Sequence, residues 1–591
     1  MFKNTLKTAL IGGSLLASGL ASALNFNEAF EGQWIESGAE NAGNGQAFAF
    51  EYIKSGPEQG IMFLSGYVYD DAGEQFWLFG QTPVLDGNFS FDFDIQVIQG
   101  GQFVANPTAS GLDITKFGDA SLVVDTCRGM NLSINNIASD RVAATSVDVS
   151  LVPFDEIGGQ LRDASVCPYQ EAFTACPSFA TAGPIERSCS VSGTLTGDIT
   201  LTNNATWVLS GGVFVGGDNT TPANMTVEPG TRIVGASGND FIAIQRGSKI
   251  FAEGTPNAPI VFSGPFNAGA AEAGPGNWGG LVINGNAPIN VCNDDDFANC
   301  SAVGEGGAGS YGGGDANDSS GVLKYVRVQF GGFKINDTNE LNGIAFQGVG
   351  AGTVVDYIQV HANEDDGIEF FGGTVNAKHV VLTDIRDDSL DWTQGWNGNV
   401  QYVLIQQNPD TAVDKDRGFE SDNFDDGNDN NPRSQPLIAN ATLIGAAADG
   451  RDTIGMILKE GTGGNITNSI VTGFESCLDI DDSTTFAAAG APDNLTGVLT
   501  INNTIFDCPV NFQEDGDGTF TVEAFFNAQM GNVTQTVNLE NGFIPADNTV
   551  RGFTIDATRF GAFFDKVDYA GAFDSQSAAW TNGWTDFLVT D

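Results

Sequence analysis

Acidic side chains recur at matched positions in two neighbouring segments of the chain. The stretch NEDDGIEFFGG, residues 363–373, is followed by IRDDSLDWTQG, residues 385–395, with the same alternation of acidic and apolar residues. Clustered carboxylates either bind a hard cation such as Ca²⁺ or share protons in acid and base catalysis. The matched residues are Asp365, Asp366 and Glu369 in the first stretch and Asp387, Asp388 and Asp391 in the second.

Short β-branched strands recur through the second part of the chain without helices between them. Examples are YIQVHAN at residue 357, HVVLTDI at 379 and YVLIQQN at 402, whose starts differ by 22 (379 − 357) and 23 (402 − 379) residues. A period of this length with longer insertions is typical of a parallel β-helix, in which each repeat forms one coil. We therefore predict an all-β chain whose main part is a right-handed parallel β-helix.

The remaining sequence predicts four further parts. Before about residue 165, apolar and polar residues alternate between Gly and Asp turns, as in antiparallel strands. Lys3 and Lys7 precede an apolar run and a small-residue triplet, as in a secretory signal peptide. The predicted parts are a signal peptide (1–23), a small antiparallel β-sandwich or barrel (24–165), a linker (166–188), the parallel β-helix (189–560) and a C-terminal cap (561–591), in which Trp580 and Trp584 cover the last coil.

The charge of the chain excludes two classes of partner. The sequence contains 24 Lys and Arg against 74 Asp and Glu, a formal net charge of −50. Such a chain is repelled by nucleic-acid phosphates and by anionic lipid headgroups. After the predicted signal peptide, no apolar stretch reaches the roughly 18 to 20 residues of a membrane-spanning helix. We expect an exported protein, located outside the cell, on its surface or in the periplasm.

Eight cysteines behind an export signal predict disulfides rather than zinc sites or thiol chemistry. The short interval CNDDDFANC predicts a bond between Cys292 and Cys300, and Cys477 with Cys508 would join neighbouring turns. The spacing leaves the pairing of four others open: Cys127, Cys167, Cys176 and Cys189.

In a β-helix the two acidic stretches would lie on successive coils, about 4.8 Å apart. Two unit charges at that separation repel by roughly 3.5 kcal/mol at an effective dielectric constant near 20. The carboxylates must therefore extend into water, take up protons or hold a cation between them. We expect near contacts between Asp365 and Asp387 and between Glu369 and Asp391.

The cation hypothesis extends to the loop ESDNFDDGNDNNPRS, residues 420–434, which crowds carboxylates as calcium loops do, although without the spacing of an EF-hand. The stretch DIDDS, residues 479–483, shows a weaker form of the same pattern. The predicted Ca²⁺ ligands are Asp365, Asp366, Glu369, Asp387, Asp388, Asp391, Glu420, Asp422, Asp425 and Asp426.

Catalysis is the alternative chemistry for the same region. Paired carboxylates carry out glycoside hydrolysis, and a polysaccharide lyase would add Ca²⁺ and a basic group. The catalytic candidates are Asp366, Asp388, Lys459 and Arg433. Beside them, Trp392 and Trp396 either form a sugar-stacking surface or seal the interior of the coil.

Motifs from about residue 190 to 588 carry a family resemblance. The segments LTGDITLTNNATWVLSGGVFVGG, YVRVQFGG and VDYAGAFDSQSAAWTNGWT are similar to those of a group of exported proteins from marine and Gram-negative bacteria with right-handed parallel β-helices. The resemblance implies the fold and an exported location, and it supplies no catalytic residues.

The sequence as a whole predicts an exported, calcium-stabilised protein that binds glycans or other cell-surface components, as an adhesion protein does. One alternative is a polysaccharide lyase or glycoside hydrolase that acts through the acidic coils. Another is a structural component of a surface layer or matrix.

Overall fold

The computed structural model describes most of the chain. The described residues are 32–36, 47–56, 59–69, 75–85, 90–99, 113–126, 129–137, 143–153, 173–185, 187–235, 237–256, 258–264, 274–292, 297–336, 339–409, 416–447, 451–546, 548–555, 561–574, 579–586 and 588. The predicted signal peptide lies outside these residues, as do Cys127 and Cys167.

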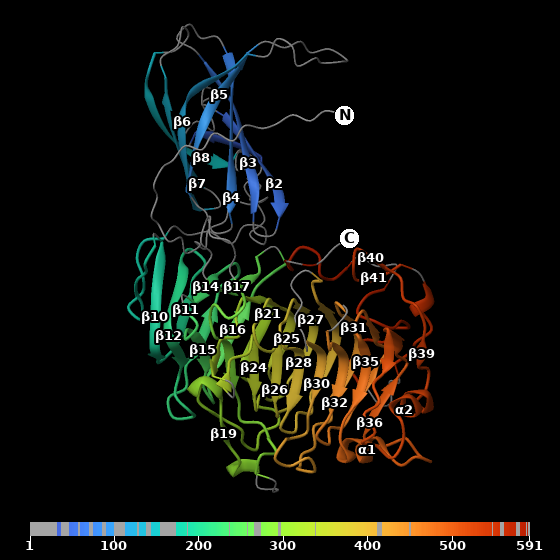
Figure 1. The fold of residues 1–591 in the computed structure, drawn as a ribbon. Helices are drawn as coiled ribbons and strands as arrows, with labels where there is room; N and C mark the ends of the chain where they lie inside the picture. Colours follow the sequence, from blue (N-terminus) through green and yellow to red (C-terminus); the bar gives the residue numbers. More distant parts are fainter. Residues whose placement is uncertain are drawn as a thin grey trace.

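The first eight strands form a closed antiparallel barrel (Figure 1, blue). Each strand pairs with the next, and β1 also pairs with β8, which closes the sheet. Alternate residues point inward and are apolar, so that Trp34, Phe50 and Leu64 are fully buried. The predicted antiparallel β fold is therefore confirmed, in its barrel form. The strands are β1 (Gly32–Glu36), β2 (Ala47–Gly56), β3 (Gln59–Tyr69), β4 (Gln75–Leu85), β5 (Ser90–Gln99), β6 (Asp113–Thr126), β7 (Gly129–Asn136) and β8 (Ser146–Pro153).

A parallel β-helix follows, as predicted, and its coils stack from green to red in Figure 1. Three parallel sheets form its sides. One of them, here called the site sheet, carries the acidic stretches. Its strands are the ends of β10 (Ser188–Leu195) and β12 (Thr206–Val215), followed by β15 (Phe241–Ile244), β18 (Gly280–Asn284), β24 (Ile344–Gln347), β26 (Ile368–Phe371), β28 (Asp388–Thr393), β30 (Arg417–Ser421), β32 (Ile454–Leu458), β35 (Ser476–Ile480) and β38 (Val510–Phe512).

The other two sheets share several long strands that bend from one sheet into the next. The bent strands are β21 (Gly321–Gln329), β25 (Val354–His361), β27 (Asn376–Thr383), β29 (Asn399–Gln406) and β31 (Leu437–Ile444). The shorter strands of these two sheets are β10 (Ser188–Leu195), β11 (Ile199–Leu201), β13 (Asn224–Val227), β14 (Arg232–Gly235), β16 (Lys249–Glu253), β17 (Ile260–Ser263), β33 (Gly464–Thr467), β34 (Ile470–Thr472), β36 (Leu499–Asn502), β37 (Ile505–Asp507) and β39 (Val533–Thr534).

At each bend one residue adopts a positive φ, and these residues form a ladder. On four successive coils they are Tyr325, Tyr357, His379 and Tyr402, with φ between 49° and 65°. Their rings stack, with centroids 4.5, 4.1 and 5.0 Å apart from one coil to the next. Ring stacking stabilises a backbone conformation that residues other than glycine rarely adopt.

Aromatic rings also stack inside the coil, beneath the acidic stretches. Phe370 lies between Phe346 and Trp396, with ring centroids 5.3 and 4.0 Å away and nearly parallel planes. Trp392 and Trp396 are both fully buried in the same cluster. These buried rings support the strands of the site sheet and so fix the positions of the residues that face outward.

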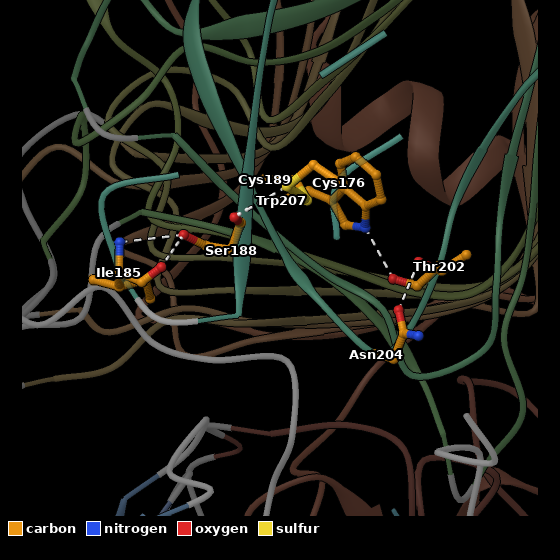
Figure 2. Close-up of a disulfide and its surroundings, with 7 residues drawn as sticks. All are labelled: Cys176, Ile185, Ser188, Cys189, Thr202, Asn204 and Trp207. Carbon is orange, nitrogen blue, oxygen red and sulfur yellow. Dashed lines mark hydrogen bonds between the residues drawn. A yellow bond between two sulfur atoms is a disulfide. The ribbon is translucent and has the colours of Figure 1, made fainter. Parts of the chain in front are cut away.

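The first coil is closed by a short segment held by a disulfide (Figure 2). Cys176 is bonded to Cys189 of β10, with a Cα–Cα distance of 5.6 Å. Phe179 stacks on Trp207, and the Trp207 indole Nε1 donates to the Thr202 carbonyl at 2.9 Å (Figure 2). β9 (Thr181–Ala182) pairs with β10 in the antiparallel sense, so this segment covers the edge of the first coil.

The last coils are covered by a short helix. The ring of Phe526 in α2 (Val522–Ala528) stacks on Phe506 of β37, with centroids 4.3 Å apart. A second helix, α1 (Ser483–Ala489), begins at the N-cap Asp482. The predicted bond between Cys477 and Cys508 joins two coils here, and the predicted bond between Cys292 and Cys300 closes a loop farther up the coil.

The C-terminal segment runs back along the side of the coil. The described residues between 543 and 588 are here called the C-terminal strap, and several of them, such as Phe543, Phe573 and Trp584, pack with Val381 and Leu404. The Trp584 ring packs edge-on against the ladder rings of Tyr325 and Tyr357, with ring centroids 5.9 and 5.8 Å apart. The sequence placed Trp580 and Trp584 at the last coil. In the structure they lie beside much earlier coils, because the ladder offers them aromatic partners.

Polar side chains fasten the strap to the coil. Gln359 and the Asp586 backbone exchange two hydrogen bonds, at 2.6 and 3.0 Å. Asn440 donates to the Tyr569 carbonyl at 2.9 Å, and Arg327 forms an ion pair with Asp586 at 3.1 Å. The strap thereby connects coils that are far apart in the stack.

We predict that Phe370→Ala lowers the free energy of unfolding by about 3–5 kcal/mol, because the ring is buried between two others and its loss leaves a cavity. Chemical denaturation followed by tryptophan fluorescence measures the change. Val354→Ala is the control, since this strand residue is 49% exposed. A similar loss in both variants would contradict the stacking argument.

Candidate functional site

An outward-facing column on the site sheet changes from apolar to acidic along the coil. Ala243, Val282 and Ala345 occupy three successive rungs after Phe214 and are buried beneath the loop that contains Cys300 and Tyr311. The next three rungs carry Glu369, Asp391 and Glu420 in direct register. The predicted alignment of Glu369 with Asp391 is confirmed.

Asp366, two residues before β26, and Asp388, the first residue of β28, lie beside this column. The Asp388 backbone N–H donates to Asp366 Oδ1 at 3.0 Å. Asn342, on the preceding coil, donates its amide N–H to Glu369 Oε2 at 2.6 Å. These hydrogen bonds hold the carboxylates of two coils in one place.

The carboxylates converge into what we call the acidic pit. They form three overlapping groups, each with one oxygen per residue within 4.8 Å of the others. Asp366 and Asp387 each belong to two groups, so the pit is continuous. The groups are Glu340, Asp365 and Asp387; Asp366, Glu369 and Asp391; and Asp366, Asp387 and Asp388. The predicted proximity of Asp365 and Asp387 is thus present.

A hairpin inserted between coils supplies one wall of the pit. Its strands are β22 (Lys334–Asn336) and β23 (Asn339–Glu340), which pair antiparallel. Lys334 Nζ lies 3.2 Å from Glu340 Oε1 and 3.9 Å from Asp387 Oδ2. One lysine therefore bridges the hairpin and the coil.

Burial makes full ionisation of the pit unfavourable. It raises the pKa of Asp366, Glu369, Asp388 and Asp391 well above the usual range, and the neighbouring carboxylates raise it further. Burial, with a hydrogen bond to Glu340, raises the pKa of Asp365 to about 10. The pit must therefore hold protons or bind cations.

In each of two carboxylate pairs, the pKa of one group is raised and the pKa of the other is lowered. The hydrogen bond from Asp365 lowers the pKa of Glu340. Burial opposes ionisation of Glu420, yet a hydrogen bond from Asp388 and the charge of Lys459 hold the pKa of Glu420 below its ordinary value. In each pair one carboxyl group keeps a proton while the other is ionised.

Several oxygens of the pit have no hydrogen-bond partner. They are Oδ1 of Asn342, Oδ1 of Asp388 and Oδ1 of Asp391, and each side chain is at least nine-tenths buried. Buried polar atoms are nearly always satisfied in folded proteins, by a protein group, a water or an ion. Amide and carboxylate oxygens are the ligands that a hard cation takes.

Of the two predicted basic groups, Lys459 lies at the pit, and Arg433 belongs to a neighbouring loop. Lys459 Nζ is 2.6 Å from Glu420 Oε1 and 3.9 Å from Asp422 Oδ1. Burial alone would lower its pKa, but these carboxylates raise it, so Lys459 remains an ammonium ion. Arg433 binds the carbonyls of Asn428 and Gly461 and the carboxylate of Asp429, which holds the loop shape. Neither group has the features of a catalytic base.

The structure locates the residues of two further predictions for this region. Trp392 and Trp396 form no sugar-stacking surface, because both rings have no exposed area and fill the coil. Asp425 and Asp426 are exposed in the loop and belong to none of the carboxylate groups of the described residues, whereas Glu420 and Asp422 reach the edge of the pit through Lys459.

Sequence reasoning missed Lys334, Glu340 and Asn342. Lys334 and Glu340 lie on the inserted hairpin, which follows no repeat. Asn342 lies two residues before Ile344 of β24, as Asp366 lies two residues before Ile368 of β26. Including the preceding coil in the sequence alignment would have identified it.

The fold and the pit together define a parallel β-helix with a carboxylate-lined site on one sheet. Residues 193–585 match the family model described as a pectate-lyase-like β-helix domain, and the chain belongs to this family. Among solved structures, two variants of the catalytic domain of a GH87 alpha-1,3-glucanase, each in complex with tetrasaccharides, are similar at 10% identity, with TM-scores of 0.26 and 0.23. Each alignment covers 88% of this chain and 96% of the other. No curated protein sequence matches the chain.

We predict that, in the presence of a chelator, Asp391→Asn is more stable than the wild type, and that this difference in stability grows as the pH rises. A carboxyl group with a raised pKa binds its proton more tightly in the folded state, so the free energy of unfolding falls with rising pH above about 4, the ordinary pKa. The variant lacks this group, and its advantage over the wild type should grow between pH 5 and 8, by at most about 1.4 kcal/mol per pH unit for one proton.

Denaturation midpoints at several pH values in EDTA measure this difference. Asp493→Asn, which removes an exposed carboxylate of the same type, is the control and should show no such trend. An advantage of Asp391→Asn that stays constant with pH would contradict the assigned protonation.

Proposed function

We propose that this chain is an exported protein that binds acidic polysaccharide through Ca²⁺ held in the acidic pit. The observation that supports the proposal is the set of buried carboxylate and amide oxygens without partners, on the outer side of a rigid sheet. The disulfides support export, because such bonds persist in oxidising compartments. Among the described residues, no helix has both the length and the apolar character that a membrane span requires.

The ligand chemistry favours Ca²⁺ over other metals. The groups that meet in the pit offer oxygen atoms only, without histidine or cysteine among the described members. Ca²⁺ takes six to eight oxygen ligands in flexible geometry, whereas Mg²⁺ requires a compact octahedron and retains water. Transition metals would be expected to recruit nitrogen or sulfur.

The proposed ligand follows from charge and from the family description. With a formal charge of −50, the chain repels any polyanion unless a cation lies between them. Pectate lyase, for which the family is named, acts on pectate, an acidic polysaccharide. A Ca²⁺ ion that keeps free coordination positions in the pit would bind the carboxylates of such a chain, and binding would then require Ca²⁺.

Glycoside hydrolysis is the second candidate, and the pair of Asp388 and Glu420 favours it. These side chains share a hydrogen bond, with Asp388 protonated and Glu420 ionised beside Lys459. Glycoside hydrolysis requires one protonated and one ionised carboxyl group, which these enzymes hold about 5–9.5 Å apart, so Asp388 and Glu420 would have to separate when a substrate binds. β-Elimination has less support, because Lys459 is held as an ammonium ion and Arg433 is used in the loop.

Calcium should raise the stability of the chain and enable binding. We expect the melting temperature to rise with Ca²⁺ and to fall with EDTA, since a ligand that binds only the folded state stabilises it. Asp391→Asn should lose at least tenfold in Ca²⁺ affinity, and its melting temperature should rise less with Ca²⁺ than that of the wild type. Asp493→Asn should behave as the wild type, and equal calorimetric titrations of the two variants would contradict the site.

A glycan panel separates binding from hydrolysis. Polygalacturonate and alginate, with neutral dextran as the control, are incubated with the wild type in Ca²⁺ or EDTA. We expect the protein to bind the acidic polymers in Ca²⁺ but not in EDTA, and to release no oligosaccharide. Released reducing ends that disappear in Asp388→Asn would establish the hydrolase instead, and retention in EDTA would exclude the calcium bridge.

A further inference from the structure

A second group of carboxylates lies farther along the site sheet, two rungs beyond Glu420. The outward-facing column continues from Glu420 through Ile457 to Asp479 of β35. Asp479, Asp481 and Asp515 each place one oxygen within 4.8 Å of the others. At about 4.8 Å per rung, this group is roughly 10 Å from Glu420.

The three residues come from two separate segments. Asp481 follows β35, and its backbone N–H donates to the Leu458 carbonyl at 2.9 Å. Asp515 follows β38, whose register with β35 pairs Leu478 with Phe512. The same register, continued by three residues, places Asp515 beside Asp481. The group therefore joins one coil to the loop that leaves the next.

That loop leads directly into the helix that covers the last coils. Glu514 accepts hydrogen bonds from the backbone N–H groups of Val522 and Glu523 at the start of α2, at 3.1 and 3.0 Å. The Gln513 N–H donates to the Leu478 carbonyl at 2.9 Å. Because Glu514 is adjacent to Asp515, an interaction that holds Asp515 in place also holds the start of α2 in place.

Asp479 supplies the independent sign of a ligand. Its side chain is 1% exposed, and its Oδ1 has no hydrogen-bond partner. Among the described residues, none of the three carboxylates forms an ion pair with Lys or Arg; the nearby Lys459 is already paired with Glu420 and Asp422. A buried carboxylate with an unsatisfied oxygen that meets two others must take up a proton or bind a cation, and a cation would satisfy all three carboxylates together.

We propose that Asp479, Asp481 and Asp515 bind a second Ca²⁺ ion, separate from the acidic pit, which locks the loop before α2 onto the coil. Three carboxylates from two segments, completed by backbone carbonyls or water, form a suitable oxygen ligand set. This site is structural, and it does not depend on the proposed function of the pit. Its role is to close the C-terminal end of the stack.

The test uses the full chain and measures Ca²⁺ binding and local protection together. Asp515→Asn removes an exposed ligand from the loop, and Asp493→Asn is the matched control. Calorimetric titration should show that Asp515→Asn loses one Ca²⁺ per chain or weakens it at least tenfold, while the binding assigned to the pit persists. Asp391→Asn should instead lose or weaken the Ca²⁺ bound in the acidic pit, while binding at the second site persists.

Hydrogen exchange gives the second readout. In the wild type, Ca²⁺ should slow exchange in residues 505–528 at least fivefold, and Asp515→Asn and Asp481→Asn should both lose this effect. Circular dichroism verifies that the variants are folded. Identical titrations and exchange for Asp515→Asn and Asp493→Asn would overturn the proposal, and tighter binding of Mg²⁺ than of Ca²⁺ would overturn the assignment to Ca²⁺.

Discussion

Parallel pairing of successive coils is the constraint on which the structure depends. It brings equivalent side chains to within about 4.8 Å of one another, whatever their chemistry. For aromatic residues this proximity is favourable, as in the ladder from Tyr325 to Tyr402 and in the stack around Phe370. For carboxylates it is unfavourable, and the acidic pit exists because the aromatic stacks keep its members from moving apart.

The rigid frame thus holds together carboxyl groups that cannot all be ionised at once. Lys334 and Lys459 compensate part of their charge, at the two edges. The carboxylates between them, such as Asp366 and Asp391, are buried and lie close to one another. Binding a divalent cation would remove the repulsion without any rearrangement of the sheet, since its ligands are already in place.

The sequence was sufficient for features that repeat and insufficient for features that do not. The alternation of apolar and acidic residues in residues 363–373 and 385–395 determined the register, so the contact between Glu369 and Asp391 was predictable. The same alternation places Trp392, next to Asp391, inside the coil, whereas Trp396 follows the end of β28, where strand alternation gives no guide. Glu340 and the C-terminal strap escaped prediction, since long-range packing alone positions an insertion.

The strap has a consequence for how the chain folds. A solenoid whose coils contact only their neighbours can assemble and fray one coil at a time. Arg327 and Asp586, however, are 259 residues apart and joined by an ion pair, so the final residues are needed to complete coils that were made early. A chain that is synthesised N-terminus first gains this long-range connection only when the C-terminal strap has been made, and until then the side of the stack remains accessible to proteases and chaperones.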